Sequence, residues 1–220
     1  MKRIYTGVPK RALDIAVSGL MLVVLSPLLA LLSVLVRVKL GSPVLFRQLR
    51  PGRFGVAFTI YKLRTMTDAR DANAELMPDN VRLTKFGEFL RRTSLDELPE
   101  LLNVLKGHMS LVGPRPLLMR YYPFFMEQEK PRFFVRPGIT GLAQVSGRND
   151  LSWDDRIGLD LDYVRRCSLA LDMRILFLTL WRVFQRAGVQ VDPGAVMPDF
   201  DEERKGRTAN SVPTCHAANN

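Results

Sequence analysis

An apolar segment over residues 15–36 (IAVSGLMLVVLSPLLALLSVLV) contains no charged side chain and limits the fold more than any other feature. About 20 such residues cover the hydrocarbon core of a bilayer, so the segment is long enough to enter a membrane. A secretory signal peptide has a shorter apolar region, of about 7 to 15 residues, followed by a small-x-small cleavage site. We find no such site, so we expect a membrane anchor.

The charges around this segment favour a hairpin that enters and leaves the membrane by one face. Lysines and arginines lie on both sides of it, and no Asp or Glu occurs over residues 15–67. By the positive-inside rule, both flanks are then cytoplasmic. Ser26 and Pro27 lie near the middle, where proline removes a backbone hydrogen bond and a serine hydroxyl can bind a freed carbonyl. We therefore predict a re-entrant helix-break-helix, with a kinked spanning helix as the alternative.

The formal net charge of +10 requires an anionic partner, such as anionic membrane lipid, a nucleotide or lipid phosphate, or nucleic acid. No helix-turn-helix, zinc-finger or RNA-recognition signature occurs, so nucleic acid is not expected. Cys167 and Cys215 are too few and too far apart for a disulfide framework, and with His108 and His216 they form no zinc-type spacing. A metal held by carboxylates and phosphates would be Mg²⁺.

The remainder of the chain mixes short strand signals with longer helix signals. Aliphatic and aromatic side chains over residues 43–49 and 56–61 flank Pro51-Gly52, which predicts two strands joined by a turn. Apolar spacing and capping residues predict helices over residues 84–92, 96–106 and 169–186.

The expected fold class is mostly α with a small β element. Residues 1–40 would form the re-entrant membrane anchor, and residues 41–200 a compact cytosolic α/β domain with interfacial helices. The aromatic-rich stretch over residues 119–134 suits either the membrane interface or the core. Residues 201–220, rich in Ser, Thr, Asn and mixed charges, are expected to be a disordered tail.

An adjacent acidic pair, Asp96 and Glu97, stands at a predicted helix start (SLDELPELLN). Pro99 is tolerated only in the first helical turn, which places the start near residues 94–96. The N-cap is then Asp96, or Ser94 in a capping box that Glu97 closes. The positive potential of a helix N-terminus would keep Asp96 ionised and attract phosphate, making it a candidate nucleophile or magnesium ligand. Ordinary helix capping is the alternative.

Several basic residues are candidates for binding phosphate, because guanidinium groups match phosphate oxygens and lysine supplies a compact charge. Singly, each would be an ordinary surface residue. Their coincidence with rigid Gly/Pro loops, an acidic pair and a membrane anchor favours a phosphate site. The candidates are Lys62 and Arg64 after a predicted strand, Arg91 before the acidic pair, Arg115 within GPRP, and Arg148 at the end of RPGITGLAQVSGRN.

Five motifs together resemble the bacterial monotopic phosphoglycosyl transferases, in their small form with a catalytic domain alone. They are the apolar segment broken by Ser-Pro, YKLRTM, SLDELP, GPRP and RPGITGLAQVSGRN, and the resemblance extends from Lys10 to about Val191. It implies that Asp96 attacks the β-phosphate of a UDP-sugar at the cytoplasmic face of the bacterial inner membrane and releases UMP. Polyprenyl (undecaprenyl) phosphate then takes the sugar phosphate, with Mg²⁺ at the same aspartate.

The resemblance also implies roles for other residues. Glu97 matches the second member of the family's acidic dyad, the basic residues would bind substrate phosphates, and Asp172 would have a supporting part. Among donors, the resemblance favours a UDP-linked N-acetylated amino sugar, and UDP-galactose or UDP-glucose stays an alternative. A non-catalytic, membrane-tethered protein that binds anionic ligands is a further alternative. The oligomeric state and the glycoconjugate pathway are left open.

Overall fold

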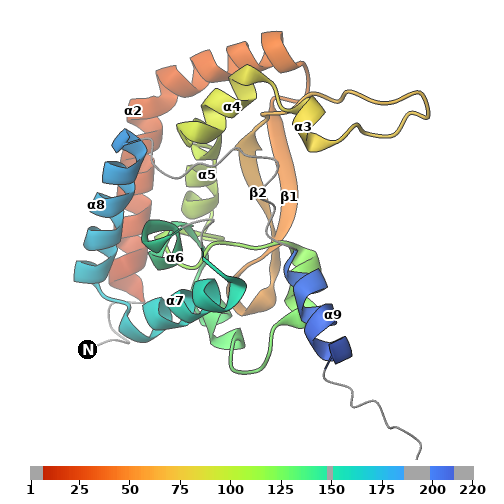
Figure 1. Ribbon diagram of the computed structural model, residues 1–220. Helices are drawn as coiled ribbons and strands as arrows, with labels where there is room; N and C mark the ends of the chain where they lie inside the picture. The colour runs from red at the N-terminus through yellow and green to blue at the C-terminus, as the bar shows by residue number, and fades with distance from the viewer. Residues whose placement is uncertain (1–6, 148–150, 186–198, 211–220) are drawn as a thin grey trace, which may run out of the picture.

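The protein is described from a computed structural model, over residues 7–147, 151–185 and 199–210. The first described element is α2 (Val8–Leu40), which rises along one side of the molecule and then bends over its top (Figure 1). Pro27 lies inside this helix, and the Ser26 hydroxyl donates a hydrogen bond to the carbonyl of Val23 at 2.8 Å. The predicted break is therefore a bend in a continuous helix, because one proline removes a single backbone hydrogen bond.

Most of α2 is exposed and apolar. It is the one helix in the described ranges that is long and apolar enough to cross a membrane, and only 11% of its most apolar window is buried. Its second half packs through Leu32, Val36 and Leu40 onto Leu63 and Leu90. The exposed apolar side chains include Leu20, Val23, Val24, Leu31, Val34 and Val38.

Two small sheets support the domain. Strands β1 (Leu45–Pro51) and β2 (Ala57–Leu63) pair in antiparallel register through the short turn η1 (Arg53–Gly55), which confirms the predicted strands within about two residues. Strands β3 (Ser110–Val112) and β4 (Gly138–Thr140) pair in parallel. The sequence analysis missed this second pair, because three residues are too few to show an alternating pattern.

The helices surround these sheets. The predicted helix over residues 84–92 is confirmed as α4, with the Thr84 hydroxyl accepting a hydrogen bond from the Gly87 N–H at 3.0 Å. The predicted helix over residues 169–186 is confirmed as α8 up to Gln185, and Arg186 lies outside the described residues. The helices after α2 are α3 (Asp79–Arg82), α4 (Lys85–Arg92), α5 (Glu100–Leu105), α6 (Leu142–Ser146), α7 (Trp153–Arg166), α8 (Leu169–Gln185) and α9 (Phe200–Asn210).

The prediction of a disordered tail is wrong for residues 201–210, which belong to α9. Phe200 is fully buried against Tyr121 and Trp153, and the Arg204 guanidinium lies 2.6 Å from a carboxylate oxygen of Glu129. One buried aromatic side chain and a buried ion pair thus hold a segment whose composition alone predicts disorder. Residues 211–220 lie outside the described ranges.

The aromatic stretch over residues 119–134 forms core. It folds into the short helices η3 (Met119–Phe124) and η4 (Lys130–Phe134). Tyr121 packs edge to face with Trp153 and Phe125 with Phe133, and both Tyr121 and Phe125 contact Phe200 at a tilted angle. The members of this cluster are Tyr121, Phe125, Phe133, Trp153, Ile157 and Phe200.

A glycine brings α4 close to the end of β2. A Cβ on Gly87 would lie 1.7 Å from the carbonyl oxygen of Thr65, so Gly87→Ala must push the helix away. We expect this substitution to lower the free energy of unfolding by about 1–3 kcal/mol or more. Gly158→Ala, at an exposed helical position with open space around it, should raise it by about 0.5–1 kcal/mol. Denaturant unfolding of both variants measures the two free energies of unfolding. Equal changes in the free energy of unfolding of the two variants would contradict the prediction.

Candidate functional site

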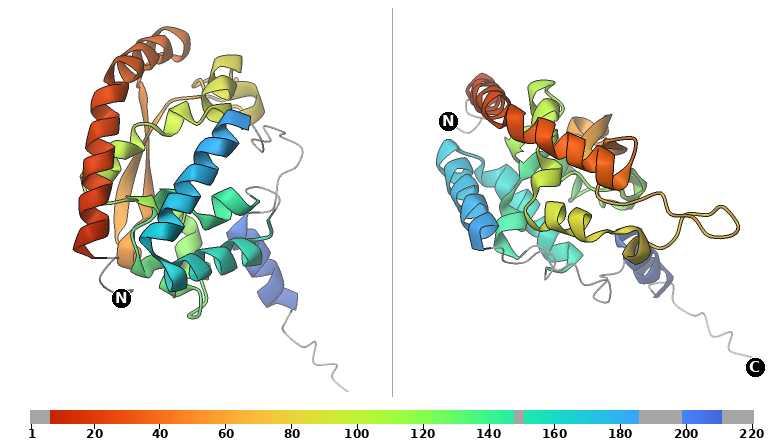
Figure 2. Two further views of the ribbon diagram at one scale, coloured as in Figure 1. Left: turned by 90° about the vertical axis from the view of Figure 1, so that its left-hand side faces the viewer. Right: turned by 90° about the horizontal axis from the view of Figure 1, so that it is seen from above.

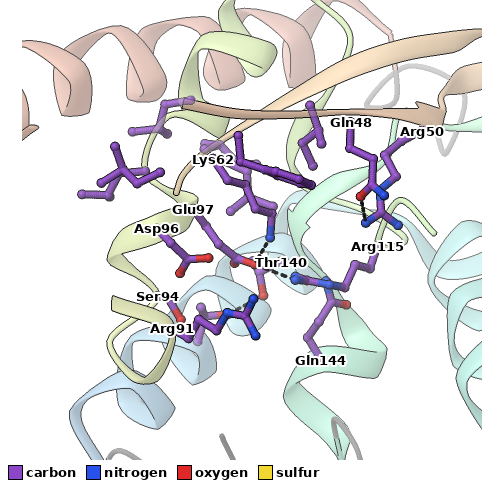
Figure 3. Close-up of a pocket in the computed structure, with 18 of the residues that line it drawn as sticks. Gln48, Arg50, Lys62, Arg91, Ser94, Asp96, Glu97, Arg115, Thr140 and Gln144 are labelled. Atoms are coloured by element: carbon purple, nitrogen blue, oxygen red, sulfur yellow. Dashed lines mark hydrogen bonds and ion pairs between the residues drawn. The ribbon is translucent and has the colours of Figure 1, made fainter. Parts of the chain in front are cut away.

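Residues from both sheets, from the turn before α5 and from the helices α2 and α8 line a large cavity of about 1270 Å³, and Figure 3 shows part of its wall. Ligand pockets are commonly about 300–1,000 Å³, so this one has room for more than a small metabolite. At one end its wall is densely charged. The labelled side chains there come from β2, α4, the turn before α5 and the loop after β3, and include Lys62, Arg91, Asp96, Glu97 and Arg115.

The acidic pair lies in the short turn η2 (Leu95–Glu97), and the capping prediction is wrong. Ser94 adopts a left-handed conformation (φ 55°), and its side chain makes no capping hydrogen bond. Pro99 directly precedes α5, where the ring needs no hydrogen bond from its missing N–H. Asp96 therefore has no capping function and its carboxylate is free to face the cavity.

Asp96 is buried, with 7% of its surface exposed, and its Oδ1 atom has no hydrogen-bond partner among the described residues. Burial and the charge of Glu97 raise the pKa of Asp96 to about 6, although nearby Lys62 and Arg115 act in the opposite direction. This shift is opposite to the strongly ionised carboxylate expected at a helix N-terminus. A buried carboxylate with a free oxygen and a raised pKa is typical of reactive groups.

Glu97 connects the two nearest cations. Its Oε1 atom lies 2.6 Å from Lys62 Nζ and 2.5 Å from Arg115 Nη2 (Figure 3). Burial alone would raise the pKa of Glu97, but the charges and hydrogen bonds of Arg115 and Lys62 hold it well below its usual range. Glu97 is therefore ionised and holds both cations at the cavity wall.

Glu100 is a member of this cluster that the sequence analysis missed. Its Oε1 atom lies 3.2 Å from Lys62 Nζ, and burial together with the charge of Glu97 raises the pKa of Glu100 to about 7. Its place in SLDELPE, one helical turn after Asp96, was the available signal. Asn103 locks this helix to β2, since its side-chain amide donates to the carbonyl of Thr59 at 2.7 Å and accepts from the N–H of Tyr61 at 3.1 Å.

The predicted basic residues have different surroundings. Lys62 and Arg115 contact Glu97, and Arg91 lines the same cavity while its Nε donates to the Thr65 hydroxyl at 3.0 Å. Arg64 also lines the cavity, but its guanidinium is occupied by the backbone carbonyls of Ser42 and Met66 and by the Asp68 carboxylate at 2.7 Å. Arg148 lies outside the described residues.

A buried ion pair supports the Arg115 loop. Arg132 Nη2 lies 2.8 Å from a carboxylate oxygen of Asp160 and also donates to the backbone carbonyl of Arg115 at 3.0 Å. Arg132 was missed because it lies within the aromatic stretch. Arg50 and Gln48 on β1, joined at 2.6 Å, were missed as well, and they extend the polar wall beside Arg115 (Figure 3).

The donor set fits a magnesium ion that is only partly held by protein. Within the described ranges no group of three or more His, Cys, Asp or Glu side chains could hold a metal alone. Mg²⁺ is often bound through one or two carboxylates together with substrate phosphates. Asp96 fits that role better than Glu97, because Glu97 pairs with both Lys62 and Arg115, whereas the only ion-pair contact of Glu100 among the described residues is with Lys62, at 3.2 Å.

Comparisons with known proteins show similarity to bacterial sugar transferases. The family model described as bacterial sugar transferase matches residues 5–186. The chain is 51% identical over 181 residues to a protein named uncharacterized sugar transferase EpsL from Bacillus subtilis, covering 82% of this chain and 90% of that protein. It is 42% identical over 185 residues to UDP-glucose:undecaprenyl-phosphate glucose-1-phosphate transferase of Klebsiella pneumoniae, covering 80% of this chain and 40% of that protein.

A third relative is undecaprenyl-phosphate galactose phosphotransferase of Salmonella typhimurium, 39% identical over 196 residues. That match covers 81% of this chain and 41% of the relative, so the chain spans well under half of the two relatives named for glucose and galactose transfer. Residues 5–186, which the family model matches, nevertheless include every described residue of the charged wall. The chain belongs to the bacterial sugar transferase family.

Proposed function

We propose that this protein transfers a sugar 1-phosphate from a UDP-sugar to polyprenyl phosphate, forming polyprenyl-diphosphate-sugar and UMP. The observation that carries the proposal is the buried Asp96 carboxylate, with one unpartnered oxygen, beside the cations Lys62, Arg91 and Arg115 in one cavity. Relatives named for glucose and galactose transfer to undecaprenyl phosphate support the reaction class.

In the proposed first step, an Asp96 oxygen attacks the β-phosphorus of the donor. The bond from that phosphorus to the bridging oxygen breaks, and UMP leaves with the electron pair. In the second step, a phosphate oxygen of the acceptor attacks the same phosphorus and releases the Asp96 carboxylate. Dividing one displacement into two is the advantage of covalent catalysis.

The neighbouring residues make this attack electrostatically possible, because a carboxylate and a phosphate repel each other. Lys62, Arg91 and Arg115 offset the donor's negative charge. Glu97 holds Lys62 and Arg115 in place. Mg²⁺, bound through Asp96 and the donor's phosphates, would supply further neutralisation of charge.

The acidity of the site predicts how activity depends on pH. Because only the ionised form of Asp96 is nucleophilic, and its pKa is about 6, we expect turnover to fall as the pH is lowered through about 6.

The stability of the fold should change with pH in the opposite direction. Folding raises the pKa of both Asp96 and Glu100, so it favours their protonated forms, and the free energy of unfolding should rise as the pH falls below about 7. Turnover and urea unfolding, each measured from pH 8 to 5, test the expected fall in activity and the expected rise in the free energy of unfolding.

The decisive assay is UMP release from a panel of UDP-sugars by solubilised protein with Mg²⁺ and undecaprenyl phosphate. The panel includes N-acetylated amino sugars, which the sequence resemblance favours, and UDP-glucose and UDP-galactose, which the relatives' names favour. Turnover that needs the lipid acceptor would support the transferase and identify its sugar. Binding of anionic lipid without UMP from any donor would favour the non-catalytic alternative.

We also propose that α2 enters the cytoplasmic leaflet of the bacterial inner membrane and returns to the same side, with anionic lipid near its basic end. The bend in α2 and the basic residues Arg37 and Lys39 in its last turn support this arrangement. A site near the headgroups would then meet both a soluble nucleotide sugar and a lipid phosphate.

Pro27→Ala tests this topology. Restoring the backbone hydrogen bond should straighten α2 toward a spanning helix and move the N-terminus across the membrane. Labelling of cysteines added at each chain end, in intact and permeabilised cells, measures which side each end occupies. Val24→Ala, an exposed change one turn earlier, is the control. Both ends remaining cytoplasmic in Pro27→Ala would argue against the bend as the cause of re-entry.

A further inference from the structure

Beyond its charged wall, the cavity continues as an apolar cleft between α2 and α8. The side chains from each helix recur at intervals of three or four residues, so they form one face of that helix. The cleft residues are Leu13, Val17 and Met21 on α2, and Met173, Leu176 and Leu180 on α8.

The helices α2 and α8, which line the cleft, converge at one end, the narrow end, and diverge toward the other (Figure 2). Figure 2 shows α2 and α8 close together near their N-terminal ends and farther apart toward the bend of α2. At the narrow end, Lys10 on α2 forms a buried ion pair with Asp172 on α8, and the Tyr163 hydroxyl donates to Asp172 Oδ1 at 2.8 Å. An ion pair and a hydrogen bond therefore hold α2 and α8 together at the narrow end, next to the part of the cleft that apolar side chains line.

The cleft leaves much apolar surface uncovered. Met21, Met173 and Leu180 are 37%, 54% and 58% exposed, although all three line a cavity that also contains Asp96 and Arg115. Contiguous exposed apolar surface of this kind marks a binding site or a membrane contact. A cavity with cations at one end and a long apolar cleft at the other is complementary to an anionic head on an apolar tail.

We propose that the cleft between α2 and α8 binds the isoprenoid chain of the lipid phosphate acceptor and places its phosphate near Asp96. The inference rests on the proposed transferase function. The uridine, sugar and diphosphate of the donor are polar and match the charged end of the cavity, which leaves the apolar end for the other substrate. Most of α2 is exposed and apolar, and α2 and α8 diverge toward its bend (Figure 2), so a chain can enter between them from the lipid phase.

A pair of double variants on α8 tests the cleft. Met173→Gln with Leu180→Gln changes two exposed cleft residues, and Phe177→Gln with Trp181→Gln changes two residues of similar exposure, 66% and 54%, that do not line the cavity. Both pairs remove apolar surface from the same helix, so both weaken general membrane contact. We expect the KM for undecaprenyl phosphate to rise about tenfold in the cleft pair, equivalent to ~1.4 kcal/mol, and less than about twofold in the control pair.

The KM for the UDP-sugar should change less than about twofold in the cleft pair. Wild-type protein should prefer undecaprenyl phosphate to farnesyl phosphate, and the cleft pair should lose much of this preference for the longer chain. An equal rise of the KM for undecaprenyl phosphate in both pairs, or no rise of this KM in either pair, would overturn the proposal. Competition by phosphatidylglycerol that the cleft substitutions abolish would assign the cleft to bulk lipid and also overturn it. Wild-type protein that releases no UMP from any donor would instead refute the proposed function.

Discussion

Replacing Asp96 with Asn is expected to abolish turnover while the protein stays folded. The amide has nearly the same shape as the carboxylate but is a poor nucleophile and a poor magnesium ligand. We expect the rate to fall on the order of 10⁴-fold or more, as when the nucleophile of a covalent mechanism is removed. The neighbouring Glu97 does not replace it, because the Glu97 carboxylate pairs with Lys62 and Arg115.

Stability should respond in the opposite way to activity. Burial raises the pKa of Asp96 to about 6, so its ionised form at neutral pH is unfavourable in the folded protein. A neutral Asn removes that cost, and we expect Asp96→Asn to raise the free energy of unfolding at pH 7.5 by about 1–3 kcal/mol. Loss of activity together with higher stability separates a chemical role from misfolding.

The measurement combines UMP release with denaturant unfolding of the same preparation. Glu88→Gln is the matched control, since this half-buried carboxylate on α4 forms, among the described residues, only a long ion pair with Arg92, at 3.9 Å. It should keep near wild-type activity. UMP release by Asp96→Asn within tenfold of the wild type would remove Asp96 from the proposed role.

The elements that the sequence predicted well depend on local signals. Thr84 gives α4 its cap, aliphatic and aromatic side chains on either side of Pro51-Gly52 give β1 and β2, and the uncharged run gives α2. The elements that it missed depend on distant contacts. The β3 and β4 strands are stable only as a pair far apart in sequence, and α9 is held by Phe200 packing into an aromatic cluster. Local propensity contains neither kind of information.

In the site, too, the sequence predicted the local features and missed those that depend on the whole fold. Residue types and motifs indicated Asp96, Glu97, Lys62, Arg91 and Arg115, and the structure lines one cavity with all five. The sequence did not predict the sign of the pKa shift of Asp96, because that depends on burial and on the charge of Glu97 outweighing three cations. A helix-cap argument considers only the local backbone, whereas desolvation is set by the whole fold.

Glu97→Gln is expected to have the second largest effect, through the two cations that Glu97 holds. Its Oε1 atom is the shared acceptor for Lys62 and Arg115, so a neutral amide removes the carboxylate that holds these two cations together and leaves Lys62 with Glu100. We expect kcat/KM to fall on the order of 10²-fold, since removing one preorganised electrostatic contact commonly has that effect. Arg115 should become mobile, while the Arg132 contact still holds its backbone.

The pH profile distinguishes this positioning role from simple misfolding. The charge of Glu97 raises the pKa of Asp96, so removing it should lower that pKa and move the acidic limb of the remaining activity to lower pH. Glu97→Asp, which keeps the charge but shortens the side chain, should leave the limb near its wild-type position while also slowing turnover. An unshifted limb in Glu97→Gln would mean that the two carboxylates do not interact during the reaction. A limb that moves to lower pH in Glu97→Gln but not in Glu97→Asp would show that one carboxylate sets the acidity of the other and places the cations for attack.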